Sequence, residues 1–184
     1  MTHHGIASSL IRCGGFTPRN DEPLLPSPYS LHMVILGIDP GFGRIGWGII
    51  EGSGNDWAYV AHGCIETSAA HELSRRLFDL SEALDSIIDM YHPDLAAIES
   101  LFFNKNVTTG IQVAHARGVI LLSCFKRKIE IVERTPSQVK QAVVGHGAAT
   151  KDQIQKMIGL HLHLKTPITQ DDAADAIAIA LSAR

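Results

Sequence analysis

The chain has 184 residues and 45% hydrophobic content, which suits one domain with a full core and is too short for two domains of ordinary size. Its three cysteines, Cys13, Cys64 and Cys124, are odd in number and widely spaced, which excludes a disulfide framework or a CxxC metal knuckle and favours a reducing compartment. No apolar run approaches the roughly 18 residues of a membrane span, and no secretory signal is recognisable. We therefore expect a soluble, cytoplasmic protein without a membrane partner.

The net charge of −3 argues weakly against a nucleic-acid partner, but the charge is unevenly distributed. Residues 1–98 carry 5 Lys and Arg against 12 Asp and Glu, whereas residues 99–184 carry 11 against 7. The second half can therefore present a basic face to phosphate groups. Ordinary solvated charges would explain the same counts equally well.

The first 32 residues are rich in Pro, Ser, Gly and His and show no apolar periodicity, which predicts a disordered extension. Dense patterning starts at Met33, so we expect residues 33–184 to form the folded domain. One hypothesis is that Met33 is the natural first residue. A targeting peptide fits less well, because Asp21, Glu22 and the nearby prolines do not suit an amphipathic presequence.

Three strands are predicted at the start of the domain. Residues 34–39 form a short apolar run that ends in turn residues, residues 44–50 are glycine-rich but able to form a strand, and residues 57–66 have strand composition. The short glycine-bearing turns between them predict an antiparallel meander. Residues 72–91 place leucines and isoleucines at helical spacing, which predicts an amphipathic helix that covers this sheet.

The second half alternates strands and helices. A buried strand is predicted at residues 94–99, and a helix at residues 107–126 is apolar on two sides, so we expect it to pack on the sheet and on a second copy of the chain. The remaining elements are a strand at 129–133, a helix at 137–144, a helix that starts at Thr150 with Gln153 as its capping-box partner, and a helix at 172–183. This order predicts an α/β fold with five strands and helices on both faces of the sheet.

The segment from Gly41 to Gly46 matches the dinucleotide-binding pattern GxGxxG directly after a strand. That pattern must open a helix, whereas Gly48, Gly52 and Gly54 follow here, and each would cost a helix interior about 1 kcal/mol. A hairpin is therefore the favoured interpretation.

Two predicted strands end on acids. Asp39 follows the first apolar run, where it can reach into a cleft as an oxygen ligand or cap its own turn. Glu99 ends an otherwise hydrophobic strand, where an acid has to face solvent or a site because burial of an unpaired carboxylate is very costly.

The last helix begins with more acids than capping needs. Asp172 and Asp175 share one helix face, and although acids in a first turn interact well with the helix dipole, Asp171 makes a third. Like charges at this spacing repel unless a cation lies between them. Together with Asp39 and Glu99, these acids can converge on two divalent ions about 3.5 to 4 Å apart, the arrangement that hydrolyses phosphodiesters.

Magnesium suits a site made only of carboxylates, whereas zinc would want His or Cys, and His161 and His163 cannot share a helix face. Candidate DNA contacts surround the acids. Lys105, Lys140 and Lys151 each lie in or beside a turn or a helix start. Phe102 and Phe103 follow Glu99 beside polar residues, so we expect one ring to stack on bases and the other to join the core.

At these residues the chain resembles the RuvC family of Holliday-junction resolvases, over about residues 34–183. Five motifs in the family's order make the resemblance specific: Gly37-Ile38-Asp39-Pro40-Gly41 through Gly46; Ala97-Ile98-Glu99 with Phe102 and Lys105-Asn106; Ala116-Arg117-Gly118; Ser137-Gln138-Val139-Lys140 with Val144-Gly145 and Lys151; and Asp172-Ala173-Ala174-Asp175-Ala176.

The resemblance implies an RNase H-like mixed five-stranded sheet. It implies that Mg²⁺, with two ions per site and Mn²⁺ able to substitute, is bound by the catalytic acids Asp39, Glu99, Asp172 and Asp175. It also implies that Phe102 disturbs or stacks on bases near the crossover and that Lys140 and Lys151 contact the phosphate near the cut. Asp171 is an alternative to Asp172, but Asp172 keeps the three-residue spacing.

The family acts as a homodimer that nicks two strands of like polarity in four-way junction DNA during recombination and repair, in concert with a branch-migration motor of the RuvA and RuvB type. Three alternatives remain. An ATP-binding member of the actin and sugar-kinase superfamily would need a second copy of the hairpin, and a non-catalytic junction binder would not need all four acids. A nuclease acting on RNA hybrids would leave the two-sided helix and Phe102 unexplained.

Overall fold

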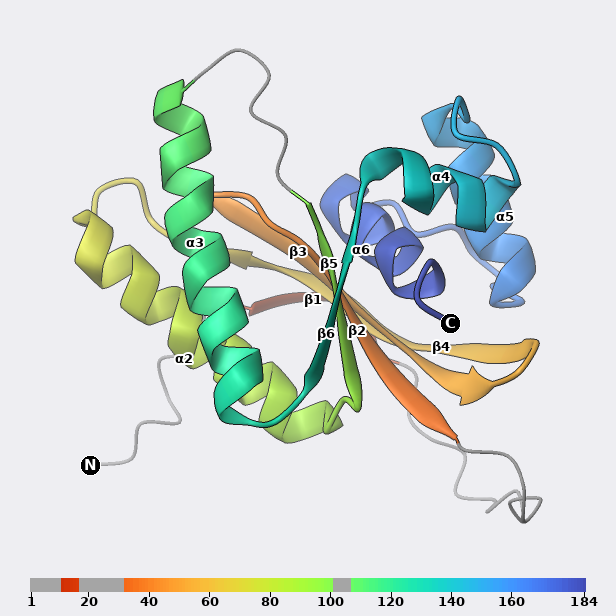
Figure 1. The fold of residues 1–184 in the computed structure, drawn as a ribbon, viewed down its shortest axis with the longest axis horizontal. Helices are drawn as coiled ribbons and strands as arrows, with labels where there is room; N and C mark the ends of the chain where they lie inside the picture. Colours follow the sequence, from red (N-terminus) through yellow and green to blue (C-terminus); the bar gives the residue numbers. More distant parts are fainter. Residues whose placement is uncertain (1–10, 17–31, 101–106) are drawn as a thin grey trace.

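A computed structural model describes residues 11–16, 32–100 and 107–184 (Figure 1). Its strands are β1 (Ile11–Phe16), β2 (Met33–Asp39), β3 (Arg44–Ser53), β4 (Asp56–Glu66), β5 (Leu95–Glu99) and β6 (Glu130–Arg134). Its helices are α2 (Leu73–Tyr91), α3 (Val107–Lys126), α4 (Pro136–Val144), α5 (Lys151–His161) and α6 (Asp171–Leu181). None of the helices within these ranges is long and apolar enough to cross a membrane.

The strands form one mixed sheet in the order β1-β4-β3-β2-β5-β6. Strands β4, β3 and β2 make the predicted antiparallel meander, whereas β5 pairs parallel with both β2 and β6. The five strands and five helices predicted from the sequence are thus all present. Their bounds differ from the predicted ones by no more than a few residues, as expected for element ends.

Strand β1 is a difference from the sequence prediction, because it lies within the segment expected to lack regular structure. It pairs antiparallel with the outer side of β4, with a register shift between Cys13 and Gly15, and gives the sheet a sixth strand. The outer side of β4 presents a row of backbone donors and acceptors, which a strand can satisfy whatever its side chains are. Composition is therefore a poor guide to a strand of this kind.

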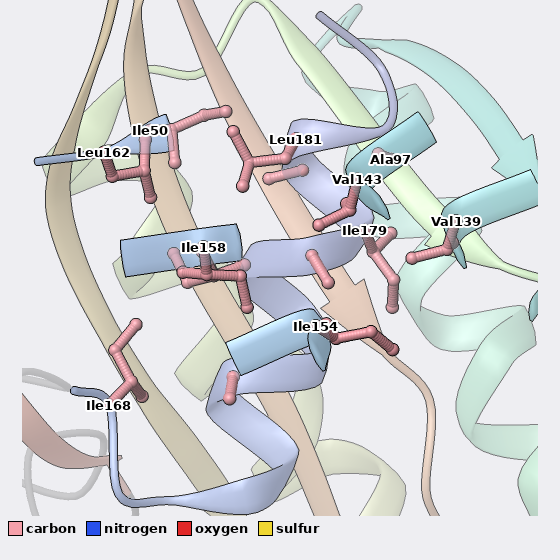
Figure 2. Close-up of a cluster of buried hydrophobic side chains, with 14 of the residues drawn as sticks. Ile50, Ala97, Val139, Val143, Ile154, Ile158, Leu162, Ile168, Ile179 and Leu181 are labelled. Atoms are coloured by element: carbon pink, nitrogen blue, oxygen red, sulfur yellow. The ribbon is translucent and has the colours of Figure 1, made fainter. Parts of the chain in front are cut away.

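Helices cover both faces of the sheet (Figure 1). Helices α2 and α3 lie on one face, over a core that includes Leu36, Trp47, Leu84 and Ile120. Helix α6 lies on the other face, and α4 and α5 pack against it. The side chains in that second core come from strands, from all three helices and from the connection between α5 and α6, as Figure 2 shows for Ile50, Ala97, Val139, Val143, Ile154, Ile158, Leu162, Ile168, Ile179 and Leu181.

Glycines in β2 and β3 let α6 lie directly on the sheet. A methyl group at Gly37 would overlap the backbone of Ala176, one at Gly46 would overlap the carbonyl oxygen of Asp172, and one at Gly48 would lie 2.5 Å from Cδ1 of Ile177. Gly46 is the last glycine of the run that superficially matches a dinucleotide-binding loop, and Gly48 follows that run. The role of both is to clear space for the helix that carries the C-terminal acids.

Gly46→Ala should lower the free energy of unfolding by about 1 to 3 kcal/mol, because the added methyl group must push α6 away from the sheet. Gly159→Ala is the matched control. Gly159 lies inside α5 with no atom within 4 Å of the added methyl group, so this change should stabilise the chain by up to about 1 kcal/mol. Urea unfolding measures both, and equal effects of the two substitutions would contradict the close contact.

Candidate active site

Asp39 and Glu99 end neighbouring strands at the same edge of the sheet. Strands β2 and β5 are parallel, and their register pairs Ile38 with Ile98, the residues directly before the two acids. Both acids line a cavity of about 270 Å³. The sequence could predict each acid at a strand end, but only the parallel pairing places them side by side.

Helix α6 brings its acids to the same edge. Residue 172 rests on Gly46, which pairs with Asp39 across β2 and β3. Asp175, one turn further along, lines the cavity with Asp39 and Glu99. Asp172 lies at the margin, where its Oδ2 is 3.2 Å from Nε of Arg44 and its side chain is 34% exposed.

Asp171 occupies a different position from Asp172. Its side chain is 65% exposed, and its Oδ2 lies 3.0 Å from Nζ of Lys151. Asp172, but not Asp171, is among the charges that raise the pKa of Asp39. The N-cap of α6 is Gln170, without a side-chain cap hydrogen bond, so neither acid caps the helix and both lie in its first turn.

The acids share an environment that disfavours their ionisation. Burial raises the pKa of Asp39 from 3.8 to about 7, helped by the charges of Glu99, Asp175 and Asp172 and opposed by Lys151. Burial also raises the pKa of Glu99, with a contribution from Asp175. For Asp175, burial raises the pKa while Lys151 lowers it. A cation placed among these carboxylates would relieve both causes, loss of hydration and mutual repulsion.

The donor set fits a hard divalent cation, because every acid offers carboxylate oxygen. Within the described ranges, no three Asp, Glu, His or Cys side chains are arranged closely enough to hold a metal ion as they stand. Side-chain cations neutralise the acids instead. Nζ of Lys151 lies 3.0 Å from Asp171 and 3.7 Å from Asp175, and Arg44 contacts Asp172. These ion pairs engage carboxylate oxygens that a divalent cation would otherwise bind.

Two lysines predicted as DNA contacts, Lys140 of α4 and Lys151 of α5, line the cavity together with the acids. Helix α5 begins at the predicted cap, since Thr150 and Gln153 form a reciprocal capping box. The apolar part of the wall is formed by Pro136, Val139, Ile154, Ala178 and Ile179. The cavity thus combines acids, two cationic side chains and a hydrophobic base.

Phe102 and Lys105, predicted to read DNA, lie outside the described residues. Nε2 of His161 donates a hydrogen bond to the carbonyl oxygen of Val143, 3.0 Å away, and His161 does not line the cavity. Sequence reasoning did not single out Arg44, which it treated only as part of the glycine pattern and as the start of a strand, whereas the structure pairs Arg44 with Asp172. Its position directly after the turn that follows Asp39 was the available signal.

A buried arginine secures that turn. Arg76 of α2 lies with its guanidinium 3.6 Å from the ring centroid of Phe42 and donates hydrogen bonds to the Phe42 carbonyl oxygen and to Oγ1 of Thr67. The backbone N–H of Thr67 donates to the carbonyl oxygen of Gly43. These contacts fix the segment between Asp39 and Arg44, and so the entry to the site, from the opposite face of the sheet.

Comparison with known proteins shows which family the chain belongs to. The sequence profile of the family "Crossover junction endodeoxyribonuclease RuvC" matches residues 35–183. A protein of that name from Petrotoga mobilis is 53% identical over 148 residues, which cover 80% of this chain and 91% of the relative.

The chain belongs to the RuvC family.

The solved structure of Thermus thermophilus RuvC in complex with a Holliday junction substrate is similar to this chain, with a TM-score of 0.78 and 30% identity over 82% of this chain and 92% of that one. The yeast mitochondrial Holliday junction resolvase shares the fold, with a TM-score of 0.60 at 13% identity over 80% of this chain and 76% of that one. The fold is thus the RNase H-like one expected for the RuvC family, with β1 outside the matched range.

The free energy of unfolding of the metal-free protein should fall as pH rises from about 4 to about 7. The pKa of Asp39 is higher in the folded state than its ordinary value of 3.8, so the folded state holds this proton more tightly. The effect of Asp39 is fully present below pH 4 and is lost as pH rises through about 7, with an upper limit of ~4 kcal/mol.

Asp39→Asn should remove this dependence and exceed the wild type in stability above pH 7. Urea unfolding in a metal chelator at pH 5 and pH 8 measures the difference. Asp56→Asn, at the exposed start of β4, is the control for the chemical change. An Asp39→Asn variant with the same pH slope as the wild type would contradict the charge accumulation at this site.

Proposed function

We propose that this RuvC-family chain is an endonuclease that resolves four-way (Holliday) junction DNA by metal-dependent hydrolysis of phosphodiester bonds. The observation that carries the proposal is the meeting of Asp39, Glu99 and Asp175, from two strands and a helix, in one cavity with Lys140 and Lys151. Carboxylates with repelling charges suit divalent cations, and lysines beside them suit phosphate groups. The relative crystallised with a Holliday junction substrate supports the choice of substrate.

The four acids Asp39, Glu99, Asp172 and Asp175 would hold Mg²⁺, as two ions per site, and Mn²⁺ would substitute. When bound, the metal supplies an activated water and neutralises the developing charge on the leaving oxygen. Asp172 is preferred over Asp171 as a ligand, because Asp172 lies against Gly46 and its charge raises the pKa of Asp39. Asp171 instead forms an ion pair with Lys151.

The side chains of the protein bind and orient the scissile strand. Lys140 and Lys151 would each contact a phosphate at the cavity, and Lys151 exchanges its ion pairs with Asp171 and Asp175 for DNA when the metal neutralises the acids. We include Phe102 and Lys105 in the DNA interface because they follow Glu99 closely in the sequence, where Phe102 would stack on bases near the crossover.

We propose that the active form is a homodimer joined through α3. Ile111, Leu122 and Phe125 are 50%, 52% and 76% exposed, and their spacing puts them with Gly118 on one face of that helix. The opposite side of α3 is buried on the sheet through Ile120 and Cys124. An apolar stripe of this kind fits the second copy predicted from the sequence. Two copies would give two active sites, and hence symmetric nicks in strands of like polarity.

The catalytic unit in this proposal is residues 33–184, since the family profile covers residues 35–183. We further propose that the protein works in the cytoplasm during recombination and repair, with a branch-migration motor of the RuvA and RuvB type as its partner. Motor and nuclease would meet on the same junction DNA.

Cleavage of a synthetic four-way junction with Mg²⁺ tests the proposed function, with a linear duplex of the same sequence and the Asp39→Asn variant as controls. We expect paired, symmetric nicks in the junction alone. Asp39→Asn should reduce the rate at least 100-fold while junction binding persists, since it removes a carboxylate ligand. Junction binding without nicks in any divalent metal would favour a non-catalytic binder, and neither binding nor nicking would refute both.

Phe125→Glu should shift the protein from dimer to monomer, because it replaces the most exposed apolar side chain of the stripe with a charge. Analytical ultracentrifugation measures the change. Met90→Glu is a matched control, since Met90 is a 67% exposed apolar residue of α2 outside the stripe, and it should leave the dimer intact. A dimer that survives Phe125→Glu would place the interface elsewhere.

A further inference from the structure

Arg117 of α3 reaches from its helix to the end of β5. Its Nη1 donates a hydrogen bond of 2.8 Å to the main-chain carbonyl oxygen of Glu99. Its Nη2 lies 2.7 Å from Oε1 of Glu133 in β6, and the side chain of Arg117 is only 11% exposed. One guanidinium therefore joins α3, β5 and β6 at the residue that supplies an acid to the cavity.

The hydrogen bond from Arg117 matters for the backbone of Glu99, because the hydrogen-bonded pairing of β5 with β2 ends before this residue. The pairing of β5 with β2 ends at Ile98, whereas on the other side Glu99 still pairs with Arg134 of β6. The next residue, Ser100, donates its N–H to the carbonyl oxygen of Arg134 at 2.8 Å. Glu99 is thus held by β6 and, from the helical layer, by Arg117.

We propose that Arg117 is a positioning residue, which sets the direction of the Glu99 carboxylate by holding the Glu99 main chain. The inference rests on the proposed function for the role of Glu99. Arg117 contacts the carbonyl oxygen, so its effect on the site is geometric. It does not contact the substrate in this role.

The guanidinium suits this task because two of its nitrogens point in fixed directions from one plane. Nη2 is anchored by Glu133, which leaves Nη1 aimed at the carbonyl oxygen. A lysine at this position has one nitrogen and cannot keep both contacts in the same geometry. Glu133 therefore helps Arg117 to hold the Glu99 main chain, although the Glu133 side chain is 53% exposed and does not line the cavity.

The position of Arg117 on α3 also connects the site to the proposed dimer face. Arg117 is adjacent in sequence to Gly118 and about 100° from it around the helix, so one helix presents the apolar stripe on one side and the Glu99 contact on another. A displacement of α3 would move the Arg117 guanidinium and with it the end of β5. The dimer interface and the metal-binding edge are therefore linked through one side chain.

Calcium binding by calorimetry, junction binding in chelator, oligomeric state and single-turnover cleavage in Mg²⁺ together test the role of Arg117. Arg117→Met should weaken calcium binding 10- to 100-fold and slow cleavage by a similar factor, as is usual for residues that orient a metal ligand. Junction affinity without metal should change less than twofold, and the dimer should persist. Arg117→Lys and Glu133→Gln should give intermediate losses.

Arg127→Met is the matched control. Arg127 directly follows the last residue of α3 and binds Asp85 and Asp89 of α2, away from the cavity. Its loss should leave calcium affinity and cleavage within about twofold of the wild type. If Arg117→Met does not fold, the conservative Arg117→Lys and Glu133→Gln variants carry the same comparison.

Unchanged calcium affinity and cleavage in folded Arg117 and Glu133 variants would overturn the inference, and so would losses that appear only together with dissociation of the dimer. The proposed function fails independently, if the wild-type protein does not cut junctions. In that case the ratio of calcium affinities between wild type and Arg117→Met still decides whether Arg117 positions Glu99.

Discussion

The contact between α6 and the sheet is the constraint on which the rest of the site depends. Side chains on β2 and β3 would hold a helix away from the strands, but Gly37, Gly46 and Gly48 have none, and α6 therefore contacts the backbone of the sheet. The first turns of α6 therefore reach the strand ends that carry Asp39 and Glu99. Without that approach, the acids of α6 would be too far from the sheet to share a cation with the strand acids.

The same approach brings negative charges together in a partly buried site, where burial and neighbouring carboxylates raise the pKa values of Asp39, Glu99 and Asp175. Lys151 and Arg44 offset this repulsion through ion pairs at the margins of the site. In the proposed function, a metal ion and DNA would compete with these ion pairs, so occupation of the acids would release Lys151 toward phosphate.

The sequence predicted the mixed α/β architecture, the acids and two of the lysines, because periodicity and strand-end acids are local signals. It could not predict that residues 11–16 pair with β4, since backbone pairing at a sheet edge requires little from side chains. Nor could it separate Asp171 from Asp172 by anything but spacing. The roles of Arg44, Arg76 and Arg117 depend on contacts between elements far apart in the chain, which no local pattern reveals.

The two outer strands of the sheet limit how copies of this protein can associate. Strand β6 is only five residues long and carries Glu130, Glu133 and Arg134. At the other edge, β1 pairs beside β4 with an irregular register. Short, charged or irregular edges resist the addition of further strands. The edges of the described sheet therefore disfavour a continuous intermolecular sheet, which agrees with the proposal of a dimer joined through a helical surface. A growing β-ribbon would have no fixed end, whereas two helices that pack face to face close the assembly at two copies.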